Sequence, residues 1–228
     1  MKLILKQPLK IWQINQPFGN ASPLYTSFGL KGHNGIDFYA LDSTEIYATH
    51  DGRVTFTGYD GSGGLGVVIR TTEQFDYGDG QAYFKSLYWH LKRDSIKVTG
   101  GQTVKAGDLI ALADNTGRST GAHLHFGLKP IQKGEENWVW FNLSPDNGYN
   151  GAVDPLPYFD ISKYVFTKFM KFGSKGDEVK ELQKALYIGP VDGIFGKVTK
   201  GAVIRYQLAN NLVGDGIVGK LTRNMLNS

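Results

Sequence analysis

The sequence predicts an α+β protein with a β-rich first part and a small all-α second part. Residues 122–128 have the composition and alternation of a strand and follow a stretch rich in turn formers. Residues 177–186 instead carry apolar side chains at helical spacing. A unit that begins with Asp-Gly occurs at Asp192 and recurs at Asp215, 23 residues later, which indicates one turn–helix unit used twice.

The N-terminal residues 1–10 lack the apolar core of a secretory signal, and no apolar run is long enough to span a bilayer. We therefore expect a protein that is made in the cytoplasm without a signal peptide and has no membrane partner. A length of 228 residues fits two domains. We place the first at residues 1–160, a linker at 161–170 and the second at 171–228.

The first group of chemically active residues lies at His33 to Asp37. His33 is in a Gly-rich loop, and residues 36–40 then become strand-like. A loop imidazole followed by a strand carboxylate can converge on one metal ion.

A second group lies in the strand 122–128. Successive side chains of a strand point to opposite faces, so His123 and His125 share one face while Leu124 and Phe126 share the other. With His125 as a third ligand, two imidazoles and one carboxylate leave a coordination position open, which is typical of catalytic zinc. A structural site would usually contain cysteine, and this chain has none. The same ligands also serve non-haem iron, so the donor atoms alone leave both metals open.

The C-terminal part is predicted to form three short helices around one small core. Val179, Leu182 and Leu186 share one helical face behind an Asp cap, and Val198, Ala202 and Tyr206 follow the same spacing. The junction at residues 155–160 and the residues up to 169 contain several aromatic side chains, which favours a packed linker.

Several motifs together resemble the M23 (lysostaphin/LytM-type) zinc endopeptidases. They are Gly32-His33-Asn34-Gly35-Ile36-Asp37, Tyr88-Trp89-His90-Leu91 and residues 117–126, which end in His123-Leu124-His125-Phe126. The resemblance covers roughly residues 10–158 and implies a β-rich, antiparallel-sheet catalytic domain. It implies that Zn²⁺ is bound by three residues and that two further histidines are catalytic without being ligands. The implied ligands are His33, Asp37 and His125, and the implied catalytic residues are His90 and His123.

Two other residues near these motifs receive no catalytic role. His50 falls at a variable position of the pattern, so we expect a surface residue. Family enzymes also use a tyrosine near the intermediate, but the spacing of Tyr25 does not match cleanly, so it stays outside the predicted catalytic set.

The segment 171–226 resembles the helical peptidoglycan-binding domain type 1, often fused to cell-wall hydrolases. Residues 161–228 contain 11 Lys and Arg against 5 Asp and Glu, a net charge of +6, which leaves −2 for residues 1–160 within the total of +4. A basic domain would be attracted to the anionic polymers of a bacterial surface. A partner nucleic acid is not expected, because no basic patch is interleaved with aromatic residues.

These observations predict a monomeric zinc metalloendopeptidase that cleaves bacterial peptidoglycan. A wall-degrading enzyme without an export signal is most simply a bacteriophage endolysin, made in the host cytoplasm; a bacterial autolysin with the same chemistry is the alternative. A non-haem iron oxygenase would give His90 and His123 no role, and a non-catalytic wall-binding protein would need a broken ligand set. The scissile bond is left open. Four aromatic side chains are candidates for the rim of a substrate cleft or, equally, for the core: Tyr88, Trp89, Trp138 and Trp140.

Overall fold

The computed structural model describes residues 1–10, 13–141, 147–160, 164–186 and 188–227. It divides into two compact units, one comprising residues 1–11 and 15–155 and the other residues 12–14 and 156–228. Within the segment assigned to a linker, residues 161–163 lie outside the described residues, and Phe166 and Met170 pack in the core of the second unit. The predicted limits at residues 160 and 171 stay a prediction.

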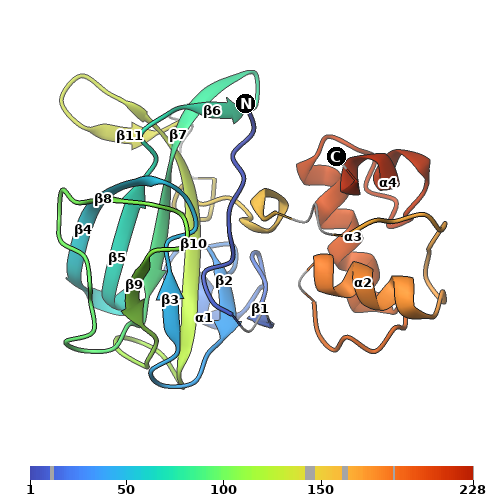
Figure 1. The fold of residues 1–228 in the computed structure, drawn as a ribbon, viewed down its shortest axis with the longest axis horizontal. Coiled ribbons are helices and arrows are strands. Elements are labelled where there is room, and N and C mark those ends of the chain that lie inside the picture. The colour runs from blue at the N-terminus through green and yellow to red at the C-terminus, as the bar shows by residue number, and fades with distance from the viewer. Residues whose placement is uncertain (11–12, 142–146, 161–163, 187, 228) are drawn as a thin grey trace. The chain divides into compact units, whose positions relative to one another are not determined.

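The first unit is β-rich and mostly antiparallel, as the sequence predicts (Figure 1). Its main sheet has nine strands among the described residues; the main path runs β1-β2-β10-β7-β5-β4-β8, with β11 beside β10 and β6 beside β7, while β3 and β9 form a separate pair. The strands are β1 (Ile14–Gln16), β2 (Ile36–Tyr39), β3 (Glu45–Tyr47), β4 (Gly52–Asp60), β5 (Gly64–Arg70), β6 (Phe75–Tyr77), β7 (Gly80–Trp89), β8 (Thr103–Val104), β9 (Leu109–Leu112), β10 (His123–Lys133) and β11 (Trp138–Trp140). The short helical elements of this unit are α1 (Pro23–Thr26) and the 3-10 turn η1 (Gly61–Gly63).

The long strands β7 and β10 occupy the centre of the sheet and bury one face of it. Alternate residues of β7 point into the core, so that Phe84 and Tyr88 are fully buried. On β10, Leu124 and Phe126 are buried in the same way, while the intervening His123 and His125 face the other side and stay partly exposed. The predicted separation of the two faces of this strand is therefore confirmed.

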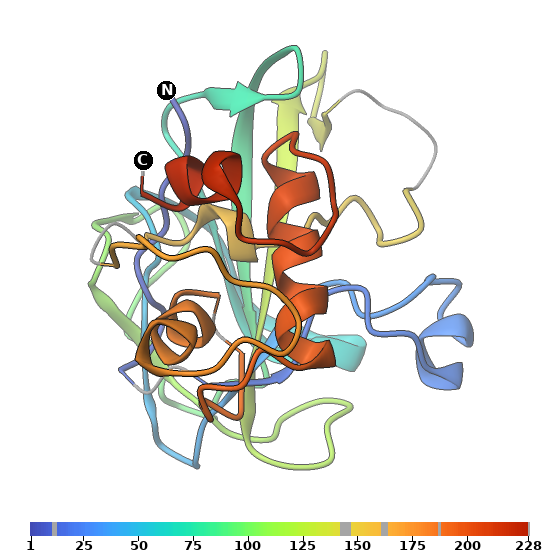
Figure 2. The same cartoon turned by 90° about the vertical axis from the view of Figure 1, so that its right-hand side faces the viewer.

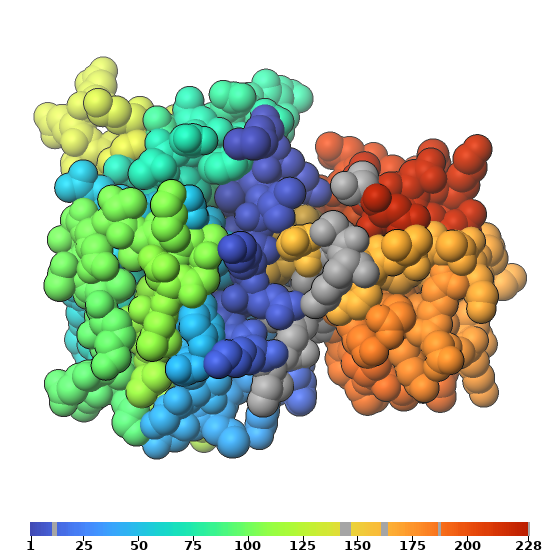
Figure 3. Space-filling model, viewed as in Figure 1, coloured from blue at the N-terminus to red at the C-terminus, as the bar shows by residue number. Residues whose placement is uncertain are grey.

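The N-terminal segment packs against the first unit. Figure 3 shows these first residues, in dark blue, running along the surface of the β-rich unit. Leu3, Leu5 and Leu9 of this segment are buried in that unit. The backbone N–H of Lys6 donates to the carbonyl of Thr49 at 2.7 Å.

The second unit contains three helices among its described residues, α2 (Asp177–Ala185), α3 (Lys197–Ala209) and α4 (Lys220–Leu226), and the 3-10 turn η2 (Leu156–Tyr158). In Figure 2, which faces this unit, α4 lies beside the upper part of α3 and α2 beside its lower part. The core includes Leu182, Phe195 and Tyr206. The predicted Asp cap of α2 is wrong. Gly176 occupies the cap at φ 123°, where glycine is strongly favoured, and Asp177 begins the helix. The predicted inward position of Val198 is also wrong, because its side chain is 61% exposed.

The recurring Asp-Gly unit forms the same hydrogen-bond pattern twice. The side-chain amide of Gln183 on α2 donates to the carboxylate of Asp192, and its oxygen accepts from the N–H of Gly193. Gln207 on α3 makes the equivalent bonds to Asp215 and Gly216. Each buried glutamine therefore fixes the loop that precedes the next helix.

No described helix is both long enough and apolar enough to cross a bilayer.

Candidate metal centre and acid–base residues

Strand pairing brings together the three residues predicted to bind metal. Asp37 is the second residue of β2, and β2 pairs antiparallel with β10 so that Asp37 lies directly opposite His125. His33 precedes β2 by three residues. Its backbone N–H and carbonyl are hydrogen-bonded to Asn20 and Gly19, which hold the loop against the end of the sheet.

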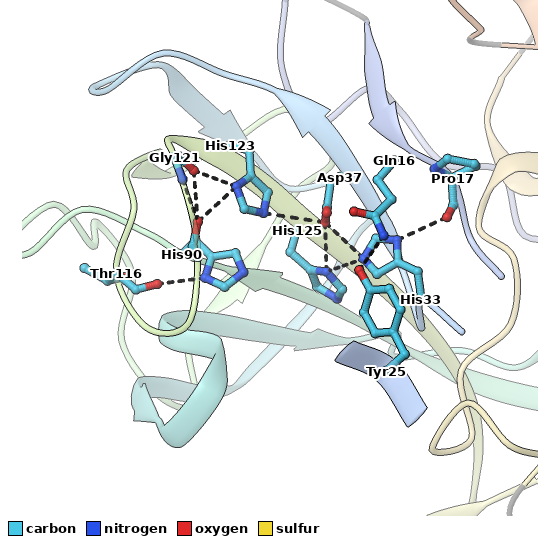
Figure 4. Close-up of polar contacts among 11 residues, drawn as sticks. Gln16, Pro17, Tyr25, His33, Asp37, His90, Thr116, Gly121, His123 and His125 are labelled. Atoms are coloured by element: carbon cyan, nitrogen blue, oxygen red, sulfur yellow. Dashed lines mark hydrogen bonds and ion pairs between the residues drawn. The ribbon is translucent and has the colours of Figure 1, made fainter. Parts of the chain in front are cut away.

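Three side-chain atoms converge at this point (Figure 4). His33 Nε2 lies 2.9 Å from His125 Nδ1 and 3.1 Å from Asp37 Oδ1, and His125 Nδ1 lies 3.0 Å from Asp37 Oδ1. Tetrahedral bonds of about 2.0–2.1 Å to one zinc ion would separate its ligand atoms by roughly 3.3 Å. The observed spacing is close to this value, and two nitrogens with one carboxylate oxygen are donors that zinc accepts. The residues therefore fit a zinc ion, and they form a group of potential metal ligands within the described part of the chain.

Two local features fix the orientation of the imidazoles. His33 Nδ1–H donates to the carbonyl of Pro17 at 3.1 Å, which leaves the Nε2 lone pair directed at the centre. The ring of His125 packs against the backbone of Gly35. A Cβ atom at Gly35 would lie 2.7 Å from His125 Nε2 and 2.6 Å from the carbonyl oxygen of Phe126. Glycine is therefore required between His33 and Asp37.

The electrostatics keep these groups in the protonation states that a metal needs. Burial alone would raise the pKa of Asp37, but hydrogen bonds with His125 and His33 outweigh it and hold that pKa well below its usual range. Burial lowers the pKa of His125, against the opposing influence of Asp37. A charged carboxylate and a neutral imidazole are the forms that bind a cation.

The two predicted non-ligand histidines lie beside this centre. The rings of His90 and His123 are 4.6 Å apart between centroids, and those of His90 and His125 are 6.1 Å apart. His90 Nδ1 lies 2.7 Å from the carbonyl oxygen of Thr116, and His123 Nδ1 lies 2.8 Å from that of Gly121. A carbonyl only accepts, so Nδ1 of each ring carries a proton and Nε2 of the neutral ring keeps a lone pair.

His90 also has an unusual backbone. Its φ of 65° lies in the left-handed region, which is uncommon for residues other than glycine. Such strain is often found at functional positions. Burial lowers the pKa of the His90 imidazole to about 4, so the ring is neutral near pH 7 and able to accept a proton.

Tyr25 is a site residue that the sequence analysis left out. Its ring centroid lies 5.3 Å from that of His33, and its hydroxyl accepts a hydrogen bond from the side-chain amide of Gln16. Burial raises the pKa of Tyr25 to about 12, with Asp37 as a further cause, so the hydroxyl keeps its proton. Tyr25 lies on α1, which begins at Pro23 behind the N-cap Ser22, a cap and first-turn pair that the sequence displays.

The expectation for His50 is wrong, and for Tyr88 the structure decides between the two alternatives, core and rim. His50 is 4% exposed and is not a surface residue. Its Nδ1–H donates to the carbonyl of Asp51, and its Nε2 bonds to the hydroxyl of Ser86, so its polar atoms are satisfied inside the core. Tyr88 belongs to the core as well and forms no part of a cleft rim, because its hydroxyl is hydrogen-bonded to Thr49. The other predicted rim residues are partly exposed: Trp89, Trp138 and Trp140.

A sheet that presents two imidazoles and a carboxylate to one point, with two further histidines beside them, defines a metallopeptidase type of site. Residues 31–137 match the family model "Peptidase family M23", and residues 175–226 match "Putative peptidoglycan binding domain". The chain therefore contains a domain of peptidase family M23 followed by a domain of the peptidoglycan-binding type. The resemblance stated from the motifs is confirmed for both parts.

Several curated proteins are similar in sequence to the first domain. The DD-carboxypeptidase/endopeptidase Mpg of Neisseria meningitidis is 36% identical over 121 residues, which cover 53% of this chain and 25% of that protein. The glycyl-glycine endopeptidase ALE-1 of Staphylococcus capitis is 28% identical over 141 residues, 60% of this chain and 32% of that protein. The crystal structure of a zinc-containing peptidase from Vibrio cholerae has a TM-score of 0.48 and 29% identity, and the match covers 67% of this chain and 39% of that one. The chain thus spans about a third or less of the curated relatives it matches.

Proposed function

We propose that this protein hydrolyses peptide bonds of bacterial peptidoglycan with a zinc-activated water. One observation carries the proposal. His33 Nε2, Asp37 Oδ1 and His125 Nδ1 lie within 3.1 Å of one another. His90 and His123 lie beside them. The match to family M23 supports the reaction class. The names of two relatives, a DD-carboxypeptidase/endopeptidase and a glycyl-glycine endopeptidase, supply two candidate bonds.

We assign the ligands of the zinc ion to His33, Asp37 and His125. When bound, such an ion lowers the pKa of its water to about 7 and polarises a carbonyl group. The protein supplies the rest. Asp37 brings a negative charge held by its hydrogen bonds, and the hydrogen bond from His33 to Pro17 keeps the imidazole in the tautomer that ligates.

We assign proton transfer and stabilisation of the intermediate to His90 and His123. Each presents Nε2, because its Nδ1–H is committed to a backbone carbonyl. One ring accepts the proton of the attacking water while the other orients the water or stabilises the developing oxyanion. Tyr25, which keeps its proton, adds a neutral hydrogen-bond donor on the side of His33.

We further propose that the helical domain holds the enzyme on the wall. Its match to the peptidoglycan-binding type and its net charge of +6 support this role. The separate domain, residues 156–228, should bind purified walls and show no hydrolysis. Its removal should reduce cleavage of intact walls more than cleavage of soluble wall peptides, since tethering raises effective concentration only on a polymer.

The reaction is tested by mass spectrometry of the fragments released from purified walls. We expect new amino and carboxyl termini within the peptides and unchanged glycan strands, and the masses will identify the bond. Release of glycan fragments alone, or of nothing, would refute the proposal. Loss of activity on chelation and its return with Zn²⁺ but not with Fe²⁺ separates the peptidase from an iron oxygenase.

A further inference from the structure

Four cationic residues form a row across four neighbouring strands of the main sheet. Arg53 on β4 lies opposite Arg70 on β5, Arg70 lies opposite Lys85 on β7, and Lys85 lies opposite Lys129 on β10. Directly opposed residues of antiparallel strands have their side chains on the same face, about 4.5–5.5 Å apart. We call Arg53, Arg70, Lys85 and Lys129 the cationic row.

The cationic row lies on the face of the sheet that carries the metal centre. Lys129 follows His125 by four residues along β10, and Lys85 precedes Trp89, which lies opposite His125, by four residues along β7. An even separation keeps side chains on one face. Four residues of strand place Lys129, the end of the row nearest to His125, about 13 Å along the strand from the metal centre. The intervening pair, Gly127 and Leu87, carries no charge.

The row is electrostatically unfavourable by itself. Like charges in directly opposed positions of a sheet destabilise it. Among the described residues, no carboxylate forms an ion pair with Arg53, Arg70 or Lys85. Burial lowers the pKa of Lys85, and the charge of Arg70 lowers it further. Burial, followed by the charge of Arg53, lowers the pKa of Arg70 in the same way. Ion pairing among the described residues therefore does not account for the charges of Arg53, Arg70 and Lys85.

Aromatic rings pack against two of the cations, Arg70 and Lys129. The guanidinium carbon of Arg70 lies 3.8 Å from the ring centroid of Trp138, and that ring packs edge-on against Tyr83 at 4.9 Å. The ammonium group of Lys129 lies 6.0 Å from the ring of Trp140. Arg70 Nε is buried and has no hydrogen-bond partner among the described residues. A guanidinium that is fixed by stacking presents its N–H groups in a fork suited to a carboxylate.

We propose that the cationic row binds a carboxylate of the substrate peptide about four residues from the bond that is hydrolysed. The inference rests on the proposed function, which it extends to the class of substrate: an acidic peptide. An extended peptide advances about 3.3 Å per residue, so four residues span the 13 Å between the metal centre and the row. The uncharged pair Gly127 and Leu87 then lies under the intervening residues. Alignment with the metal centre favours a peptide over a phosphate polymer of the wall, which needs no such register.

Two substrates that differ in one group test the inference. They are a soluble cross-linked wall peptide with a free carboxylate remote from the scissile bond and the same peptide with that group as its amide. For the wild type we expect a KM for the acid about tenfold below that for the amide, the lower end of what a charge-assisted hydrogen bond supplies. Arg70→Gln and Lys85→Gln should raise the KM for the acid about tenfold, leave the amide unaffected and leave kcat unchanged.

Matched variants keep the test specific. Lys97→Gln removes a positive charge from an exposed position of the same unit and should keep the full preference for the acid. Arg70→Lys keeps the positive charge without the forked N–H groups of the guanidinium, and it should keep part of the preference for the acid. If Arg70→Gln does not fold, by circular dichroism, Lys85→Gln decides alone.

Four results would overturn the inference. Equal KM values of the wild type for acid and amide, or an unchanged preference in both glutamine variants, would overturn it while leaving the proposed function intact. An effect of the variants that appears only on walls carrying phosphate polymers, with no preference between the peptides, would assign the row to that polymer instead. Failure of the wild type to cleave either peptide would overturn the proposed function, and the inference with it.

Discussion

Acidification should destabilise the first unit through His50, a buried histidine outside the metal centre. Burial lowers the pKa of His50 to about 4 from its ordinary 6.5. A base with a depressed folded-state pKa binds its proton more readily in the unfolded chain. Its neutral form therefore contributes full stability above about pH 6.5, and this stability is lost as the pH falls toward 4. The linkage relation for these two pKa values gives a loss of about 2 kcal/mol between pH 7.5 and 5.

The substitution His50→Gln removes this titration and leaves all other groups in place. The variant should be less stable than the wild type at pH 7.5, because the bonds to Ser86 and Asp51 are disturbed, but the difference should shrink by about 2 kcal/mol at pH 5. Urea unfolding followed by tryptophan fluorescence suits the measurement, since Trp89, Trp138 and Trp140 all lie in the first unit. The expected change in this difference is about 2 kcal/mol. A difference that stays constant within about 0.5 kcal/mol, a quarter of that change, would refute the reasoning.

Three further predictions concern single positions. Gly35→Ala should lose zinc and activity while the unit still folds, because the added Cβ would lie 2.7 Å from His125 Nε2 and would displace that ring. Metal content and circular dichroism check this. His90→Ala should reduce wall hydrolysis by roughly 10²-fold or more with zinc retained, as loss of a general base predicts, and near-normal turnover would exclude His90 from catalysis. Gln207→Ala should destabilise the helical domain by about 1–3 kcal/mol, because the N–H of Gly216 loses its buried acceptor; an unchanged thermal unfolding midpoint would contradict this.

The sequence predicts only the local parts of the candidate site, where residues follow a strand pattern. The two-residue period of a strand places His123 and His125 on one face, and the structure agrees. The convergence with His33 and Asp37 depends on pairing between β2 and β10, which no local pattern specifies. The resemblance to a known family supplied that information, and the structure then gave the register.

The errors have a common cause, which is tertiary packing. Nothing local shows that His50 finds Ser86 inside the core, since its partner is 36 residues away. Tyr25 lies on α1, and tertiary packing, not a fixed spacing in the sequence, places its ring beside His33. The cationic row is equally invisible in the sequence, because its members come from four strands and only the pairing register sets Arg70 beside Lys85.

Zinc content tests the central assignment most directly. Elemental analysis of purified protein, after dialysis against a chelator and reloading, should give about one zinc per chain for the wild type and for His123→Ala. His33→Ala and His125→Ala should retain far less than one. Stoichiometric zinc in His33→Ala, or loss of zinc from His123→Ala with retention in His125→Ala, would contradict the ligand set proposed here.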